Sequence, residues 1–131
     1  MKRNFLTLAI AAGLLASSLT VPAGCGTARD TSTPSKALLG HWENVFPGTY
    51  MHIYYSPTEA TFDARGGGEP STLTYKITQE NQSESWLMVQ YAGSPEPLKI
   101  SLSKDRNSFT ENPSEMPQPL RYRYVDSKQE P

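Results

Sequence analysis

The chain has 131 residues but a single cysteine, Cys25, and only two histidines, His41 and His52. The histidines belong to no His-Glu-x-x-His or other metal-binding spacing. No Gly-x-Ser-x-Gly nucleophile motif occurs, and Gly66-Gly67-Gly68 is not followed by the Lys-Ser/Thr pair of a phosphate-binding loop. These absences predict a non-catalytic protein with no metal and no cofactor.

The carboxylates form no recognisable pair either. They are scattered near expected strand ends and turns, where solvated charges are common: Glu43, Glu59, Glu80, Glu84 and Glu111. The sequence therefore singles out none of them as a catalytic acid or base.

Basic clusters are also lacking. The whole chain carries a formal charge of −1, and removing Lys2 and Arg3 with a leader leaves ten basic against thirteen acidic side chains. Phosphate binding requires concentrated Lys and Arg, so the composition excludes nucleic acid as a partner.

The sequence has one mostly apolar run, and it is short. Lys2 and Arg3 precede the uncharged stretch from Phe5 to Leu19, which ends in small residues. This pattern is typical of an export signal. The run falls short of the ~20 apolar residues that a transmembrane helix needs.

Cys25 follows that signal directly, after Ala23 and Gly24. The segment resembles the lipobox of bacterial lipoproteins, in which a small pair precedes a cysteine that receives a diacylglyceryl group. An exported chain with one cysteine cannot form an internal disulfide, and lipid attachment would account for this unpaired thiol. Acyl chains contribute ~0.8 kcal/mol per buried CH₂ to membrane binding.

We therefore expect a membrane-anchored lipoprotein of the cell envelope. The alternative is a plain secretory signal, because Val21-Pro22-Ala23 fits the small-x-small cleavage pattern. That cleavage would release a soluble periplasmic or secreted chain starting at Gly24.

Four segments follow from this reading. Residues 1–24 are the signal peptide, and residues 25–37, rich in Ser, Thr, Gly and Pro, read as a flexible tether. Residues 38–126 form the folded domain and residues 127–131 a C-terminal tail. Counted from Cys25, the mature chain has 107 residues, which allows one domain.

Beyond Leu38 apolar residues alternate with polar ones, which is the period of half-buried strands. The alternation is clearest where Leu73, Tyr75 and Ile77 interleave with Thr72, Thr74, Lys76 and Thr78, and where Leu98, Ile100 and Leu102 interleave with Lys99, Ser101 and Ser103. Further strands are expected at His41 to Phe46, Thr49 to Tyr55, Thr58 to Ala64, Ser85 to Tyr91, Ser108 to Thr110 and Leu120 to Val125.

Gly, Pro, Asn and Asp separate these segments at the expected turns, and nothing after the signal reads as a helix. The predicted fold is all-β: an antiparallel meander of seven or eight short strands that forms a small barrel or sandwich. Closure of this kind removes exposed sheet edges.

Gly40-His41-Trp42 opens the first expected strand and resembles the Gly-x-Trp signature of lipocalins. That resemblance implies that the tryptophan closes one end of the barrel under an arginine from the last strand, where Arg121 and Arg123 lie. An arginine can stack on an indole while its N–H groups bind carbonyls. We therefore expect Gly40, Trp42, Arg121 and Arg123 to be structural residues.

The strand Thr49 to Tyr55 alternates in an unusual way. If Met51, Ile53 and Tyr55 face inward, then Tyr50, His52 and Tyr54 form a row on the opposite face. Such a row is either a binding surface, because aromatic side chains with polar tips are favoured at interfaces, or ordinary strand composition. If this row is not a binding surface, the segment from Glu111 to Pro119 is the next candidate for one.

Two functions remain open. The first is a tethered domain that binds or scaffolds a protein or glycan of the envelope through an exposed strand face. The second is a lipocalin-like carrier that holds a small apolar ligand inside the barrel. A hollow apolar interior favours the carrier, whereas a filled core with an exposed Tyr50, His52 and Tyr54 row favours the binding domain.

Overall fold

A computed structural model describes residues 29–45, 50–64, 66–112 and 117–131. The predicted signal peptide and Cys25 lie outside the described residues. The described elements are α1 (Pro34–Leu38), β2 (Gly40–Asn44), β3 (Met51–Tyr55), β4 (Glu59–Ala64), β5 (Ser71–Asn81), β6 (Trp86–Tyr91), β7 (Leu98–Leu102), β8 (Ser108–Glu111) and β9 (Leu120–Asp126).

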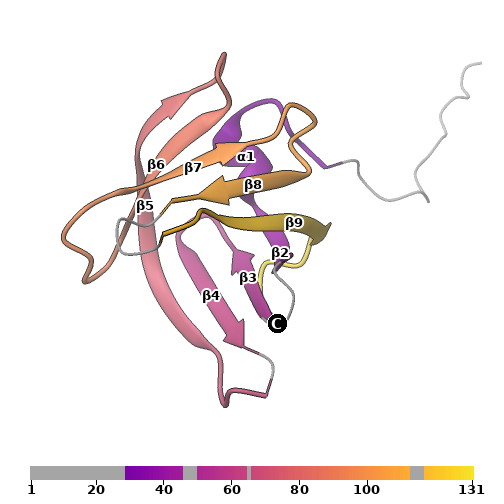
Figure 1. Ribbon diagram of the computed structural model, residues 1–131, viewed down its shortest axis with the longest axis vertical. Coiled ribbons are helices and arrows are strands. Elements are labelled where there is room, and N and C mark those ends of the chain that lie inside the picture. The colour runs from indigo at the N-terminus through magenta and orange to yellow at the C-terminus, as the bar shows by residue number, and fades with distance from the viewer. Residues whose placement is uncertain (1–28, 46–49, 65, 113–116) are drawn as a thin grey trace, which may run out of the picture.

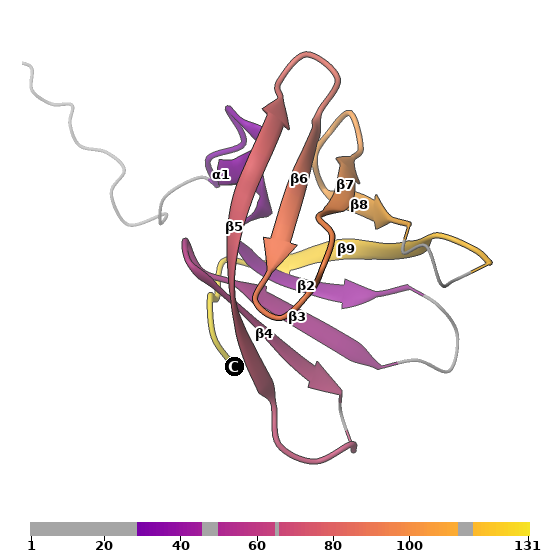
Figure 2. The same cartoon turned by 90° about the vertical axis from the view of Figure 1, so that its left-hand side faces the viewer.

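The strands form one closed barrel in the order β2-β3-β4-β5-β6-β7-β8-β9 (Figures 1 and 2). Each strand pairs antiparallel with its successor along the chain, and β9 pairs antiparallel with β2 to complete the ring. The prediction of an all-β antiparallel meander is confirmed. Of the two expected architectures, barrel and sandwich, the structure is the barrel.

The barrel interior is built from the alternating apolar residues. In β7, Ile100 and Leu102 are buried while Lys99 is exposed, as the period of two requires. Side chains from every strand fill the interior in this way: Trp42, Ile53, Tyr55, Ala60, Tyr75, Leu87, Val89, Ile100, Leu102, Phe109 and Tyr122. Ala37 and Leu38 of α1 belong to the same core. The described core is thus a packed one.

A short helix, α1, occupies part of the segment expected to be a flexible tether. Thr33 caps it by accepting a hydrogen bond from the backbone N–H of Lys36, and Pro34 occupies the first turn, where no N–H is needed. Ala37 and Leu38 are fully buried, and the Trp42 Nε1–H donates to the Leu38 carbonyl over 2.8 Å. The helix contacts β5 and β6 (Figure 2).

The barrel consequently has two distinct ends. The "α1 end" carries α1 and the turns at residues 82–85 and 103–107, because Gln82 and Arg106 both bond to the segment around the helix. The "far end" carries the turn at residues 92–97, together with the last residues of β2 and the first residues of β3 and β9.

The guanidinium that stacks on Trp42 belongs to Arg29. It lies 5.2 Å from the Trp42 ring centroid and 3.8 Å from that of Tyr124. Arg121 and Arg123 do not occupy this place, because β9 turns Tyr122 and Tyr124 inward and so turns both arginines outward. Arg123 instead pairs with Glu43 at 2.5 Å.

Gly40 occupies a position that only glycine fits. Its φ of +122° is disfavoured for other residues, and a Cβ there would lie 2.8 Å from the Asp126 carbonyl oxygen and 2.9 Å from Tyr124 Cε1. Close approach of β2 to β9 at the α1 end therefore depends on this glycine.

Candidate functional site

The structure places Tyr50, His52 and Tyr54 on the outside of the barrel but does not expose them together. Tyr50 is 68% exposed, whereas His52 and Tyr54 are buried at 7% and 6%. The expected continuous row of exposed aromatic side chains is therefore not present, and Tyr50 is its one exposed member.

His52 and Tyr54 instead belong to a compact outer cluster with His41. The His41 ring stacks on Tyr54 with centroids 4.2 Å apart. His41 Nδ1 lies 3.3 Å from an Asp126 carboxylate oxygen, and its Nε2 lies 2.7 Å from His52 Nδ1. Because a carboxylate only accepts, a neutral His41 donates to Asp126 and accepts from His52. This cluster stabilises the contact between β3, β2 and β9.

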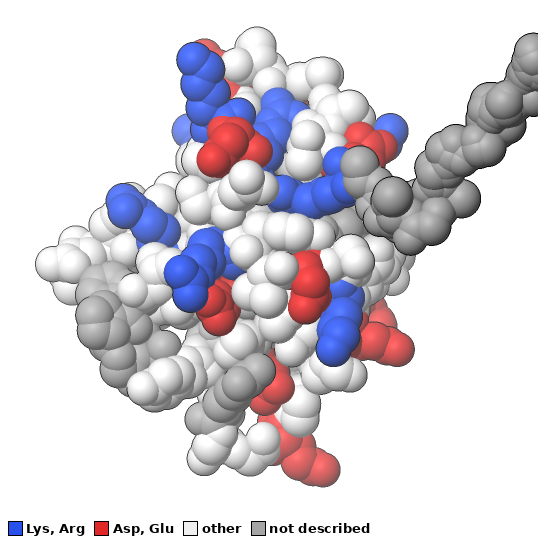
Figure 3. Space-filling model, turned by 90° about the vertical axis from the view of Figure 1, so that its right-hand side faces the viewer, with Lys and Arg blue, Asp and Glu red and all other residues white. Residues whose placement is uncertain are grey.

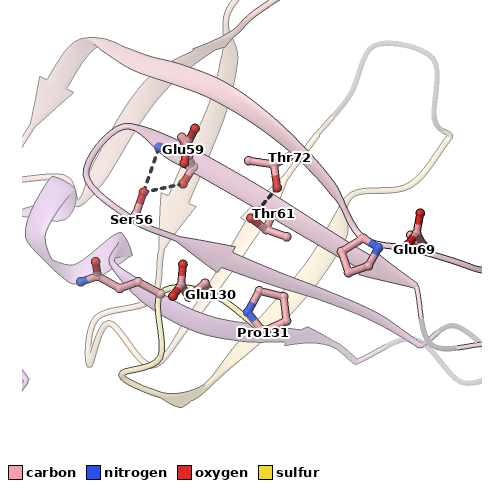
Figure 4. A pocket seen from close by; sticks show the side chains of 9 residues that line it. Ser56, Glu59, Thr61, Glu69, Thr72, Glu130 and Pro131 are labelled. Carbon is pink, nitrogen blue, oxygen red and sulfur yellow. Dashed lines mark hydrogen bonds between the residues drawn. The ribbon is translucent and has the colours of Figure 1, made fainter.

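The C-terminal residues help to cover this outer face. Gln129, Glu130 and Pro131 border a groove of about 870 Å³ together with Ser56, Glu59, Thr61, Glu69, Pro70 and Thr72 (Figure 4). Both ribbon views place the end of the chain outside the barrel beside β3 and β4. The outward-facing Thr61 lines this groove together with the tail residues and is buried.

The groove itself differs from an apolar ligand pocket. Its lining is polar and acidic, with no apolar side chain larger than proline. Its hydroxyls are used locally, since Thr61 bonds to Thr72 at 3.0 Å and the Ser56 hydroxyl accepts from the backbone N–H of Glu59. Small-molecule sites are usually lined by apolar and aromatic side chains, which this groove lacks.

A different surface lies at the far end, and we call it the far-end face: Tyr50, Val45 and Arg121. The backbone N–H of Val45 donates to the Arg121 carbonyl over 3.0 Å, so these two residues are neighbours. Glu43 pairs with His52 at the last position of the β2–β3 register, so Val45 and Tyr50 each lie two residues beyond it, at the same end of the two strands. Val45 is 40% exposed, and Arg121 is exposed.

Charged side chains of both signs are mixed on the surface of the barrel. In the face of the molecule drawn in Figure 3, basic and acidic side chains are interspersed. The Arg123 guanidinium and Glu43 form one such pair across β9 and β2. An exposed pair of this kind contributes little to stability.

The interior holds one residue that sequence reasoning placed wrongly. Glu111 was expected to be solvated near a strand end, yet it is 8% exposed inside the barrel. Burial raises the pKa of this carboxyl from 4.5 to about 7. A signal was available, because Glu111 lies two residues after Phe109 on the same strand and so shares its inward face.

Three buried tyrosines, Tyr55, Tyr91 and Tyr122, interact electrostatically with this carboxyl. The Tyr55 and Tyr91 hydroxyls lie 2.5 Å apart, and the Tyr75 hydroxyl donates to the Ser56 carbonyl. Burial, with the nearby Glu111 charge, raises the pKa of Tyr55, Tyr91 and Tyr122, the last to about 12. All these hydroxyls therefore stay protonated at neutral pH.

No metal-binding group emerges from the described residues, where no three His, Cys, Asp or Glu side chains lie close enough to hold an ion. The same residues contain no helix that is both long and apolar enough to cross a bilayer. Comparisons of the chain with protein-family models, with curated proteins and with solved structures found no match.

Proposed function

We propose that this protein is a non-catalytic, lipid-anchored domain of a bacterial cell envelope that binds a protein partner through the far-end face. The export signal and the Ala23-Gly24-Cys25 segment support the anchor. The barrel then serves as a rigid scaffold that presents Tyr50, Val45 and Arg121.

The observation that carries the proposal is the exposure of Tyr50. It leaves 68% of its surface in solvent, while Tyr54 and the large interior aromatic residues are buried. Tyrosine and arginine are enriched among the residues that dominate binding energy at interfaces. Exposed Val45 beside Tyr50 favours a protein over a glycan, because burial of an aliphatic side chain requires an apolar surface on the partner.

The interior supports the alternative functions less well. Trp42, Tyr55, Phe109, Ile53 and Leu87 are fully buried against one another, and this packing weighs against an apolar ligand inside the described barrel. Glu111 has a pKa near neutrality, but its neighbours are protonated tyrosines rather than an activated nucleophile. These features favour a binding domain over a carrier or an enzyme.

Site-specific photo-crosslinking in intact cells tests this proposal. A photoreactive phenylalanine analogue in place of Tyr50 should give a discrete adduct with one envelope protein, identified by mass spectrometry. The matched control is the same analogue in place of Lys76, an exposed residue on the outside of β5, which should give no adduct with that protein.

Tyr50→Ser should then weaken binding of the identified partner by about 30-fold or more, since an aromatic anchor contributes ~2 kcal/mol or more. The melting temperature of the Tyr50→Ser variant should stay close to that of the parent because Tyr50 is exposed. Tyr54→Ser should instead lower the melting temperature. An unchanged affinity for Tyr50→Ser, or equal adducts at both crosslinking positions, would contradict the proposed surface.

A further inference from the structure

We propose that the lipid anchor holds the barrel with its α1 end toward the bilayer and its far-end face away from it. The interaction surface is the α1 end, and its partner is the headgroup layer of a lipid membrane. This inference rests on the proposed function, because it requires the lipid on Cys25.

Arg29 is fixed to the barrel. Its guanidinium donates to the Ala37 carbonyl at 2.6 Å, to the Arg106 carbonyl at 2.7 Å and to Asn107 Oδ1 at 2.8 Å. It also stacks on Tyr124, 3.8 Å from the ring centroid. Three hydrogen bonds and a cation–π contact make Arg29 part of the folded domain.

The residues that follow are fixed as well. The Arg106 side chain donates to the Thr31 carbonyl, and the Gln82 amide donates to the Ser32 carbonyl over 2.9 Å. The backbone N–H of Ser35 donates to Glu80 at 2.6 Å. The segment after Arg29 therefore lies across the turns of the α1 end. It does not lengthen the flexible part of the tether.

The reach of the anchor is correspondingly short. Four residue steps separate Cys25 from Arg29, and a fully extended chain spans at most ~3.6 Å per residue, or about 14 Å in total. A flexible tether over the whole of residues 25–37 would reach roughly three times as far. Arg29 must therefore stay within about 14 Å of the membrane surface.

This reach is smaller than the barrel. Arg29 bonds to the turn at one end of β7, whereas the turn at residues 92–97 lies at the other end. The longest strand, β5, runs from Ser71 at the far end to Asn81 at the α1 end, ten residue steps or about 33 Å at 3.3 Å per step. A strand tilt of 35–45° leaves about 23–27 Å of this length along the barrel axis. If the far end faced the membrane, Arg29 would lie farther from the bilayer than the extended chain from Cys25 allows. The inverted orientation is therefore excluded.

The α1 end also has the chemistry of a surface that rests on headgroups. Its turns expose polar and charged side chains, including Gln82, Glu84, Lys104 and Asp105. Such side chains contact the polar layer without entering the hydrocarbon. The far-end face, with Tyr50 and Val45, is then directed toward partners outside the membrane.

Fluorescence quenching on vesicles tests the orientation with the full-length lipidated protein. Lys104→Cys and Glu96→Cys place single labels in the turns at opposite ends of β7, where both side chains are exposed. Each purified variant, labelled with the same environment-sensitive dye, is incorporated into phosphatidylcholine vesicles that contain a headgroup-spin-labelled lipid. The Lys104→Cys label should be quenched several-fold more strongly than the Glu96→Cys label.

A longer tether provides the matched control. Insertion of about 20 Gly and Ser residues between Ala28 and Arg29 should remove the difference between the labels, because such a linker behaves as a flexible coil. Equal quenching of the two labels in the protein with its unmodified tether, or stronger quenching of the Glu96→Cys label, would overturn the orientation. Failure of the protein to sediment with vesicles would instead disprove the anchor itself.

Discussion

Replacement of Trp42 by alanine is expected to lower the free energy of unfolding by about 3–5 kcal/mol, a large share of the stability of a small domain. Trp42 is fully buried and packs edge-on against Phe109 and Tyr124, with ring centroids 4.7 and 5.4 Å away. Truncation would leave a cavity at the α1 end. It would also remove the hydrogen bond to the Leu38 carbonyl that fixes α1.

Chemical denaturation monitored by circular dichroism measures this effect. Arg29→Ala should also destabilise the fold, because Arg29 stacks on Trp42 and donates hydrogen bonds to two backbone carbonyls and one side-chain oxygen. Arg121→Ala is the matched control and should change the stability by less than ~0.5 kcal/mol, since Arg121 is exposed. A Trp42→Ala variant that unfolds like the parent would show that the core does not depend on this residue.

Replacement of Glu111 by glutamine is expected to stabilise the protein by about 3 kcal/mol above pH 7 and to change little near pH 4. Below pH 4.5 the carboxyl is protonated in both the folded and the unfolded chain. As the pH rises from 4.5 to about 7, the unfolded chain ionises while the folded chain keeps its proton, so stability falls. The difference between the two pKa values corresponds to ~3 kcal/mol.

Unfolding free energies measured between pH 4 and pH 8 check this prediction. The parent should lose stability across that range, whereas Glu111→Gln should remove this part of the dependence. Glu96→Gln is a suitable control because Glu96 is exposed, and it should follow the parent. Equal stability of Glu111→Gln and the parent at pH 8 would mean that Glu111 is not held protonated by burial.

The strand pattern was predictable because a barrel wall imposes a period of two on every strand. The alternation in Leu98 to Leu102 therefore identified inward and outward residues from local sequence alone. The same rule, applied to β9, already turns Arg121 and Arg123 outward. The family resemblance placed an arginine from this strand over Trp42, and the alternation outweighs that resemblance.

The features that the sequence did not reveal depend on contacts between distant residues. The segment containing Arg29 has the composition of a linker, and its order comes from acceptors at Arg106 and Asn107, more than 75 positions away. His52 is buried although it faces outward, because it bonds to His41 on the neighbouring strand. Local periodicity reports which face a residue occupies, but not what covers that face.

The intact mass of the mature protein, produced in bacteria and purified in detergent from their membranes, tests the central claim most directly. We expect a chain that begins at Cys25 and carries the mass of a diacylglyceryl group on that residue. Cys25→Ser should abolish the modification and prevent membrane anchoring. An unmodified chain beginning at Gly24, recovered in the soluble fraction, would contradict the anchor and the orientation derived from it.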